Sequence, residues 1–312
     1  MHIRSGAIRN TNDGSGGEPC LRVDLNIGSL FALPAHASGP SGGAGDLYAA
    51  LKAAGYAGVQ HPNPREVLEH GLRATGMGRV DKPEEAEVLA AKHKAMGLDA
   101  TTLHVGNGFE SDEEMDRLAE AVLAASVTHD YPLYIETHRA TITQDMRRTL
   151  DLVERWPGIR FNGDFSHWYT GQELTYGDLA WKLERLAPVF ERTRFLHGRI
   201  GTPGSIQIDI ENPPQTECID HFRDIWTRAF AGFLRTAKPG DYIVFCPELL
   251  PAFAPLPGGG RRAFNYAPSA RGADGEWIES GDRWTQALAC TELARGCFNA
   301  ARSRIAAAET PI

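Results

Sequence analysis

The sequence has no run of basic residues, no long apolar stretch and no pair of closely spaced cysteines. Its 32 Lys and Arg are outnumbered by 40 Asp and Glu, so the net charge of −8 argues against a nucleic-acid partner. No apolar run approaches the ~18 residues that would cross a membrane. The five cysteines are scattered without a CxxC spacing, which argues against a disulfide scaffold or a structural zinc knot.

Two further signals are missing. Residues 1–17 are polar and rich in Gly and Asn, without the apolar core of a signal peptide, so we expect a cytoplasmic protein and no membrane partner. No strand–GxGxxG–helix or GxxxxGK[ST] segment predicts a nucleotide-binding fold. The composition, 42% hydrophobic and 23% charged residues, is that of a globular protein. Its 312 residues allow one large α/β domain with elaborations or two small domains.

Short apolar runs alternate with amphipathic stretches along most of the chain. This alternation predicts a parallel sheet covered by helices. The predicted strands are 21–28, 57–61, 98–106, 132–138, 159–164, 194–200 and 241–248. The predicted helices are 45–54, 83–96, 112–125, 143–156, 179–191, 218–237 and 282–308, and Ser111 with Glu114 forms the pattern of a capping box.

Seven predicted strands fit either a closed (β/α)8 barrel with one irregular or missing βα unit or an open doubly wound sheet. Periodicity alone does not separate the two. Residues 61–81 contain no clear element, and the motif spacing predicts that the missing unit falls between His104 and Glu136. Segments 34–44, 202–217 and 251–281 are predicted insertions, the last a Pro- and Gly-rich loop over one end of the sheet.

Four predicted strands end on a residue that can bind a hard or borderline metal ion. These residues are Glu136, Asp164, His197 and Glu248. Because the carboxyl ends of parallel strands lie on one edge of a sheet or around one mouth of a barrel, the four side chains are predicted to converge. Each one alone would be interpreted as an ordinary polar residue at a strand end. Four at equivalent strand ends instead favour a common site.

Three carboxylates and one imidazole make a mixed oxygen and nitrogen set without a thiolate. Such a set favours one divalent ion, and we expect Mn²⁺, with Mg²⁺, Co²⁺ or Zn²⁺ as alternatives.

Further polar residues accompany these strand ends. His167 and Trp168 follow Asp164 in a turn, and Arg199 lies two residues after His197, on the same face of the strand. His167 and Arg199 are candidates for contacting substrate hydroxyls or a developing oxyanion. His104 and His138 are candidates for lining the mouth, with a role as buried core histidines as the alternative.

Together these segments resemble the xylose isomerase-like TIM-barrel superfamily, which contains sugar isomerases, ketose 3-epimerases and metal-dependent AP endonucleases. The resemblance rests on Tyr134-Ile-Glu-Thr-His-Arg139, Gly163-Asp-Phe-Ser-His-Trp168, Leu196-His-Gly-Arg-Ile-Gly201 and Cys246-Pro-Glu248. It covers residues 98–251 and is weak elsewhere. It implies a TIM barrel in which Glu136, Asp164, His197 and Glu248 bind one divalent ion.

The resemblance also implies an activity. Glu136 and Glu248 would act as the catalytic pair of a sugar isomerase or epimerase, one removing a proton beside a carbonyl and the other returning one to the opposite face. His167 and Arg199 would contact the substrate, with Trp168, His104 and His138 beside them. The expected partner is a small sugar or sugar conjugate, and a homo-oligomer is expected because relatives often assemble.

Some features depart from the family or leave alternatives open. Many relatives end the second strand with a glutamate, where this chain has Gln60, so a role for that strand is in doubt. A lyase or deglycosidase acting on an oxidised glycoside would share the same proton abstraction. An AP endonuclease would need more metal ligands and a basic surface, and a non-catalytic sugar-binding subunit would keep only the metal site.

Because ligands from Glu136 to Glu248 must surround one ion, a single barrel over residues 21–312 is favoured over two small domains. Residues 1–20 are then expected to form a flexible N-terminal segment.

Overall fold

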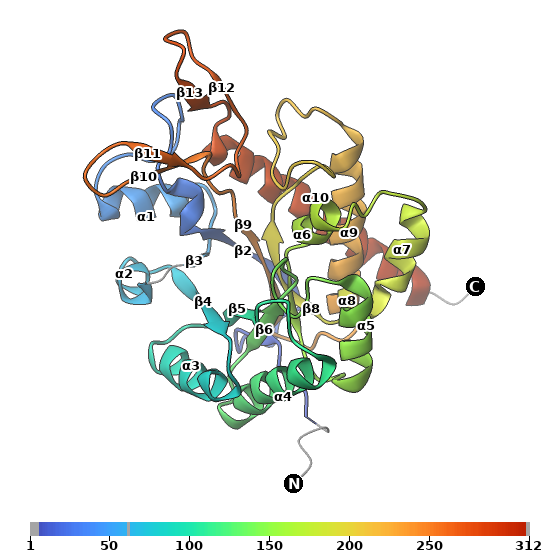
Figure 1. Cartoon of the computed structure of the whole chain (residues 1–312). Helices are drawn as coiled ribbons and strands as arrows, with labels where there is room; N and C mark the ends of the chain where they lie inside the picture. The colour runs from blue at the N-terminus through green and yellow to red at the C-terminus, as the bar shows by residue number, and fades with distance from the viewer. Residues whose placement is uncertain (1–5, 61–62, 310–312) are drawn as a thin grey trace.

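A closed barrel of eight parallel strands forms the centre of the computed structural model, which describes residues 6–60 and 63–309 (Figure 1). The strands are β2 (Cys20–Asn26), β3 (Gly58–Gln60), β4 (Arg73–Val80), β5 (Thr101–Val105), β6 (Leu133–Glu136), β7 (Phe161–Gly163), β8 (Thr193–Gly198) and β9 (Asp241–Pro247). Each strand pairs with the next, and β9 also pairs with β2, which closes the barrel. The predicted (β/α)8 fold is confirmed.

Helices surround the barrel, as expected for parallel strands that need crossover connections. They are α1 (Ala44–Ala53), α2 (Pro64–Glu69), α3 (Pro83–Ala95), α4 (Asp112–Thr128), α5 (Met146–Arg155), α6 (Ser166–Gly171), α7 (Leu179–Arg185), α8 (Ala187–Phe190), α9 (Glu217–Leu234) and α10 (Arg283–Glu309), with a 3-10 turn at Ile27–Leu30. The predicted capping box is present: the Glu114 carboxylate accepts from the Ser111 N–H at 2.8 Å, and Ser111 Oγ accepts from the Glu114 N–H at 3.3 Å.

The strand that the sequence pattern missed is β4, so the barrel has eight strands rather than seven. It lies before β5, and the expectation of a missing unit between His104 and Glu136 was wrong. Gly76 and Gly78 interrupt its apolar alternation. A Cβ on Gly76 would lie 2.8 Å from His93 Nδ1, and one on Gly78 would collide with Leu89. The glycines therefore let α3 pack closely on β4. They also break the apolar alternation by which a strand is predicted from sequence.

Two predicted helices begin or end differently. The helix predicted at 143–156 starts at Met146, because the side chain of Asp145 caps it by accepting from the Arg148 N–H at 2.7 Å. The helix predicted at 179–191 is divided into α7 and α8. Pro188 lies at the start of α8 and has no N–H to continue the first helix.

Four neighbouring barrel strands are buried on both faces, as is typical of parallel sheets covered by helices. Every residue of β6, β7, β8 and β9 is buried. Between the barrel and α9, the rings of Trp226 and Phe245 meet edge to face with centroids 4.9 Å apart. This packing makes the strand ends a fixed frame for the side chains they carry.

The segments outside the regular barrel have structure of their own. Within the N-terminal segment, Ile8 is buried and β1 (Thr11–Asn12) pairs with β9 in antiparallel fashion. Segment 251–281 contains two hairpins, β10 (Phe253–Pro255) with β11 (Arg261–Ala263) and β12 (Ser269–Arg271) with β13 (Trp277–Glu279). Figure 1 shows them at the top of the molecule, at the end opposite the N-terminus.

The predicted strand 57–61 ends at Gln60, and His61 lies outside the described residues. Among the helices of the described residues, none has both the length and the apolar character needed to span a bilayer.

Candidate metal centre

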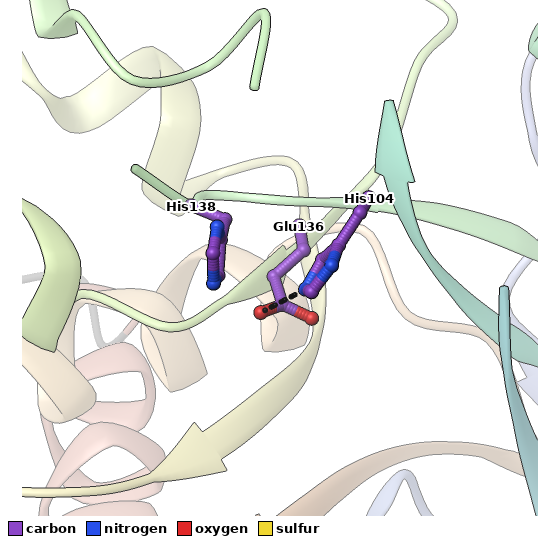
Figure 2. Close-up of side chains that lie close together, drawn as sticks. All are labelled: His104, Glu136 and His138. Atoms are coloured by element: carbon purple, nitrogen blue, oxygen red, sulfur yellow. Dashed lines mark hydrogen bonds and ion pairs between the residues drawn. The ribbon is translucent and has the colours of Figure 1, made fainter. Parts of the chain in front are cut away.

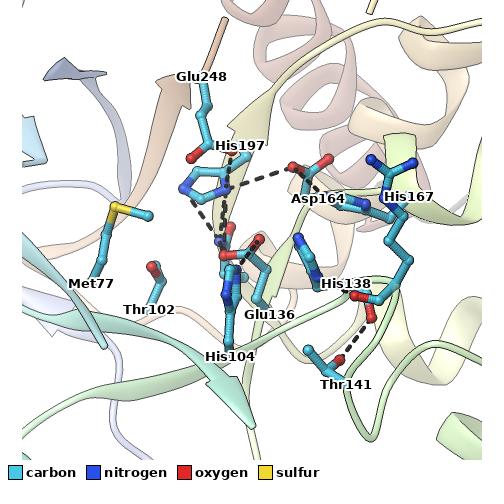
Figure 3. Close-up of polar contacts among 12 residues, drawn as sticks. Met77, Thr102, His104, Glu136, His138, Thr141, Asp164, His167, His197 and Glu248 are labelled. Atoms are coloured by element: carbon cyan, nitrogen blue, oxygen red, sulfur yellow. Dashed lines mark hydrogen bonds and ion pairs between the residues drawn. The ribbon is translucent and has the colours of Figure 1, made fainter. Parts of the chain in front are cut away.

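The four strand-end residues predicted to converge do so at the carboxyl ends of the barrel strands (Figure 3). Glu136 ends β6, Asp164 follows β7, His197 lies in β8 and Glu248 follows β9. One ligand atom from each lies within 4.8 Å of the others, and all four residues are buried. Chain segments separated by more than a hundred residues thus provide three carboxylates and an imidazole around a single point.

The imidazole of His197 directs one nitrogen toward all three carboxylates. Its Nδ1 lies 3.4 Å from Glu248 Oε2, 3.5 Å from Glu136 Oε2 and 3.8 Å from Asp164 Oδ2. Burial opposes a charge on this ring, but Glu248 and Glu136 outweigh it and raise the pKa of His197 to about 9. Without a metal, a proton on Nδ1 balances the acidic cluster; a cation would occupy the same side of the ring.

Gln60 determines how His197 is oriented. The Gln60 Oε1 lies 2.9 Å from His197 Nε2 and also accepts from Asn26 Nδ2 at 2.8 Å. Gln60 Nε2 in turn donates to Thr102 Oγ1 at 3.0 Å, which assigns the orientation of the amide. An oxygen facing Nε2 requires a hydrogen on Nε2, so the Nδ1 lone pair is available to a metal. The amide that departs from the family pattern is thus part of the centre.

Glu136 is held from two sides. Its Oε2 accepts from Asn162 Nδ2 at 2.9 Å, and its Oε1 lies 3.2 Å from His104 Nε2. Burial alone would raise the pKa of this carboxyl, but the charge of His197 and the hydrogen bonds from both imidazoles hold it well below the usual range. Glu136 is therefore an oriented carboxylate, ready to bind a cation.

Arg199 links the other two carboxylates. Its Nη2 donates to Glu248 Oε2 at 2.7 Å and closely to Asp164 Oδ2. Despite burial, this guanidinium lowers the pKa of Asp164 to about 2. Burial raises the pKa of Glu248, since His197 and Arg199 compensate for it only in part. The two carboxylates that contact the same arginine therefore differ in how readily they ionise.

Three further imidazoles lie beside the centre. Figure 2 shows His104 and His138 beside the Glu136 carboxylate, with a dashed line joining that carboxylate to His104. The ring centroids of His104 and His138 are 4.1 Å apart, and those of His138 and His167 are 3.8 Å apart. Burial lowers the pKa of His138 to about 4 and that of His167 well below its usual range. His104 and His138 are partly exposed beside the buried centre.

Trp168 lies apart from this group. Its indole Nε1 donates to the Thr143 carbonyl at 2.8 Å, and its ring packs against Phe165 with centroids 5.9 Å apart. It is 1% exposed. These contacts place the indole in the core, and a role for Trp168 in binding substrate stays a prediction.

The loops around the centre are tied together by Arg283 at the start of α10. This buried guanidinium donates to the carbonyls of Ser29 at 2.6 Å and Phe31 at 2.8 Å, and it pairs with Glu279 at 2.6 Å. Ser29 Oγ also accepts from the Leu249 N–H at 2.9 Å, immediately after Glu248. The second hairpin, the loop after β2 and the end of β9 are thus one connected unit.

The residues fit a divalent cation. Besides the donor set, the buried polar atoms without a hydrogen-bond partner in the described part of the chain include Asn162 Oδ1, both ring nitrogens of His167, and Nε and Nη1 of Arg199. His167 Nε2 lies 3.5 Å from Asp164 Oδ2. Unpaired buried polar atoms are unusual in a core, and a ligand with several oxygens would satisfy a cluster of them.

Sequence reasoning missed the amides of Asn26 and Asn162. Asn26 ends β2 and donates to Glu248 Oε1 at 3.0 Å; Asn162 lies two residues before Asp164 in the chain. Both would have been found by looking for amides as well as charged residues at strand ends and two residues away along a strand, where side chains share a face.

The comparisons with known proteins show the fold. No family model and no curated protein matches the sequence. A D-tagatose 3-epimerase-like protein matches over 91% of this chain and 99% of its own, with a TM-score of 0.53 and 8% identity. A xylose isomerase-like TIM barrel protein from Mycobacterium smegmatis, in complex with magnesium, matches over 90% and 97%, with a TM-score of 0.51 and 10% identity. The resemblance to this group of barrels is confirmed at the level of the fold.

Proposed function

We propose that this protein is a divalent-metal-dependent isomerase or epimerase acting on a keto sugar or a sugar conjugate. The observation that carries the proposal is the convergence of Glu136, Asp164, His197 and Glu248 on one buried point at the carboxyl ends of the barrel strands. Active sites of TIM barrels lie at this end. The fold shared with an epimerase-like protein and with a magnesium-bound barrel supports the same kind of site.

The four residues would hold one ion, Mn²⁺ in our proposal. When bound, it would polarise a substrate carbonyl and reduce the free-energy cost of the negative charge that develops when the neighbouring carbon loses a proton. Asn162, Asn26 and Gln60 hold the ligands Glu136, Glu248 and His197 in place by hydrogen bonds. Such outer contacts reduce the reorganisation needed on binding.

The two glutamates are the proposed acid–base pair. One removes the proton beside the carbonyl, and the other returns a proton, to the opposite face in an epimerase. His167 and Arg199 carry buried nitrogens without hydrogen-bond partners and would donate to substrate oxygens. His104 and His138 would line the entrance. Return of the proton to the neighbouring carbon would instead give aldose–ketose isomerisation.

The test combines metal analysis with proton exchange. The purified protein is first analysed by inductively coupled plasma mass spectrometry, then loaded with Mn²⁺ or Mg²⁺ and incubated in D₂O with a panel of keto sugars and oxidised glycosides. We expect about one ion per chain and deuterium at the carbon next to the carbonyl, detected by NMR. The chelated protein serves as the control.

The same assay separates the alternatives. Deuterium incorporation with release of a β-substituent would identify a lyase or deglycosidase in place of an isomerase. Stoichiometric metal with no exchange in any compound of the panel would contradict the proton-transfer mechanism and favour a sugar-binding role.

A further inference from the structure

Two arginines and a tyrosine from separate parts of the chain meet beside the metal ligands. Arg139 follows β6, Arg199 follows β8, and Tyr266 lies in the segment between the two hairpins. The guanidinium carbon of Arg199 is 5.1 Å from the centre of the Tyr266 ring, and that of Arg139 is 5.7 Å from it. Both distances lie within the range of cation–π contacts, so one aromatic ring holds two cations in the same place.

The Arg199 guanidinium is only partly satisfied by the protein. Its Nη2 contacts Asp164 and Glu248, but Nε and Nη1 are buried and have no hydrogen-bond partner. The side chain is 1% exposed. A buried N–H without an acceptor costs about 1–3 kcal/mol, so these donors indicate an acceptor that comes from outside the chain.

The guanidinium of Arg139 is also available to bind a group from outside the chain. It is exposed, and its Nη2 lies 3.5 Å from the Tyr266 hydroxyl. In residues 6–60 and 63–309, no carboxylate forms an ion pair with Arg139. Its charge therefore faces the entrance without a protein counter-ion, three residues after the ligand Glu136.

The charges of the centre favour an anion at this position. The ligand carboxylates Glu136, Asp164 and Glu248 are balanced by a divalent ion together with Arg199. Arg139 then adds one positive charge at the rim, which a neutral sugar would leave uncompensated. The planar guanidinium fork matches the geometry of a carboxylate or a phosphate.

We propose that Arg139 and Arg199, held by Tyr266, bind an oxyanion group of the substrate, so that the substrate is an anionic keto sugar: a sugar acid or a phosphate ester. This inference rests on the proposed function, because it assigns one end of the substrate while the metal ligands take the other. Arg139 determines specificity for the charged group, and Tyr266 positions both arginines.

The experiment measures binding rather than turnover, so its result does not depend on the reaction. The Mn²⁺-loaded full-length protein is titrated by calorimetry or ligand NMR with three matched probes: glycerol, glycerate and glycerol 3-phosphate. Each titration is repeated with Arg139→Gln and Arg262→Gln. Arg262 is an exposed arginine on β11, so its replacement removes the same charge elsewhere on the hairpins.

We expect an anionic probe to lose about tenfold or more in affinity in Arg139→Gln, the value of a hydrogen bond to a charged group, and to change less than about twofold in Arg262→Gln. Glycerol should bind equally to all three proteins. The probe with the larger loss, glycerate or glycerol 3-phosphate, identifies the oxyanion. Equal losses in both variants, or none, would overturn the proposal. Failure of deuterium exchange would instead count against the proposed reaction.

Discussion

Two arginines at opposite ends of the barrel, the largely buried Arg22 and the fully buried Arg199, are in opposite situations. At the amino ends of the strands, Arg22 donates to Asp24 through Nε at 2.9 Å and through Nη2 at 2.6 Å, and its Nη1 donates to Asp99 at 2.6 Å and to the Tyr242 hydroxyl at 2.8 Å. At the carboxyl ends, Arg199 has partners for Nη2 alone. The first arginine is satisfied entirely by protein atoms; the second is not.

The same strands form both ends of the barrel, yet the difference in hydrogen bonding assigns a structural role to the amino end and a functional role to the carboxyl end. Groups that complete each other stabilise the fold. Unpaired donors, closely spaced carboxylates and an unpaired buried oxygen lower the stability of the fold. A bound ligand that pairs with them removes this cost. Changes at one end should therefore alter catalysis and binding, and changes at the other should alter the free energy of unfolding.

The largest effect is expected from Glu248→Gln at the carboxyl end. Loss of a proposed base and ligand should reduce turnover by about 10²–10⁴-fold, measured by deuterium exchange. Because burial raises the pKa of Glu248, its charge opposes folding, and the metal-free variant should melt at the same or a higher temperature. Glu120→Gln, on the exposed surface of α4, is the matched control. Near-normal deuterium exchange in Glu248→Gln would contradict the assignment of Glu136 and Glu248 as the acid–base pair.

At the amino end, Arg22→Met should destabilise the protein by about 3–5 kcal/mol in urea denaturation, since it leaves Asp24 buried without its partner. Metal affinity should not change. Adding Asp24→Asn should recover part of the loss, and Arg65→Met, at an exposed ion pair, should cost less than about 0.5 kcal/mol. A loss of metal affinity in Arg22→Met would contradict the separation of the two ends.

An intermediate effect is expected at Gln60, which contacts the proposed metal ligand His197. Gln60→Leu removes the acceptor for His197 Nε2 and should weaken metal binding by about 10–100-fold in calorimetric titration of the metal-free protein. Gln60→Glu, which retains the acceptor, should keep most of the affinity. Equal affinity in Gln60→Leu and the wild type would show that the orientation of His197 does not depend on this amide.

The smallest effect concerns pH and a histidine outside the centre. Burial, assisted by the charge of Lys92, lowers the pKa of His93, whose Nδ1 lies 2.7 Å from Thr101 Oγ1. The unfolded chain therefore takes up a proton near pH 6.5 that the folded chain does not, and stability falls as the pH drops below that value. The free energy of unfolding between pH 7 and 5 should fall less steeply in His93→Gln; an unchanged slope would exclude this cause.

Much of the barrel and of its centre could be predicted because the determinants are local. Apolar runs that end in Glu136, Asp164, His197 and Glu248 predicted both the strands and the convergence of their ends. The Ser111 capping box and most helices followed from patterns within a few residues. The strand β4 could not be predicted this way, since Gly76 and Gly78 are needed by the approach of α3, which only the tertiary structure contains.

The contacts around the centre could not be predicted from the sequence either. Gln60 weakened the family resemblance, yet its position across the barrel from His197 makes it the residue that orients that imidazole. Trp168 follows the ligand Asp164 closely in sequence, but the turn into α6 directs the indole to Thr143. Tyr266 gave no signal, because its importance depends on the hairpin segment returning over Arg139 and Arg199.

By itself, the sequence determined the alternation of strands and helices and the four residues that converge at the strand ends, since backbone periodicity and strand ends are properties of short segments. The tertiary structure alone decided which donors are satisfied and which are spare. That distinction depends on atoms from distant segments meeting within hydrogen-bond distance. It separates Arg22, whose donors are paired within the protein, from Arg199, whose Nε and Nη1 are not.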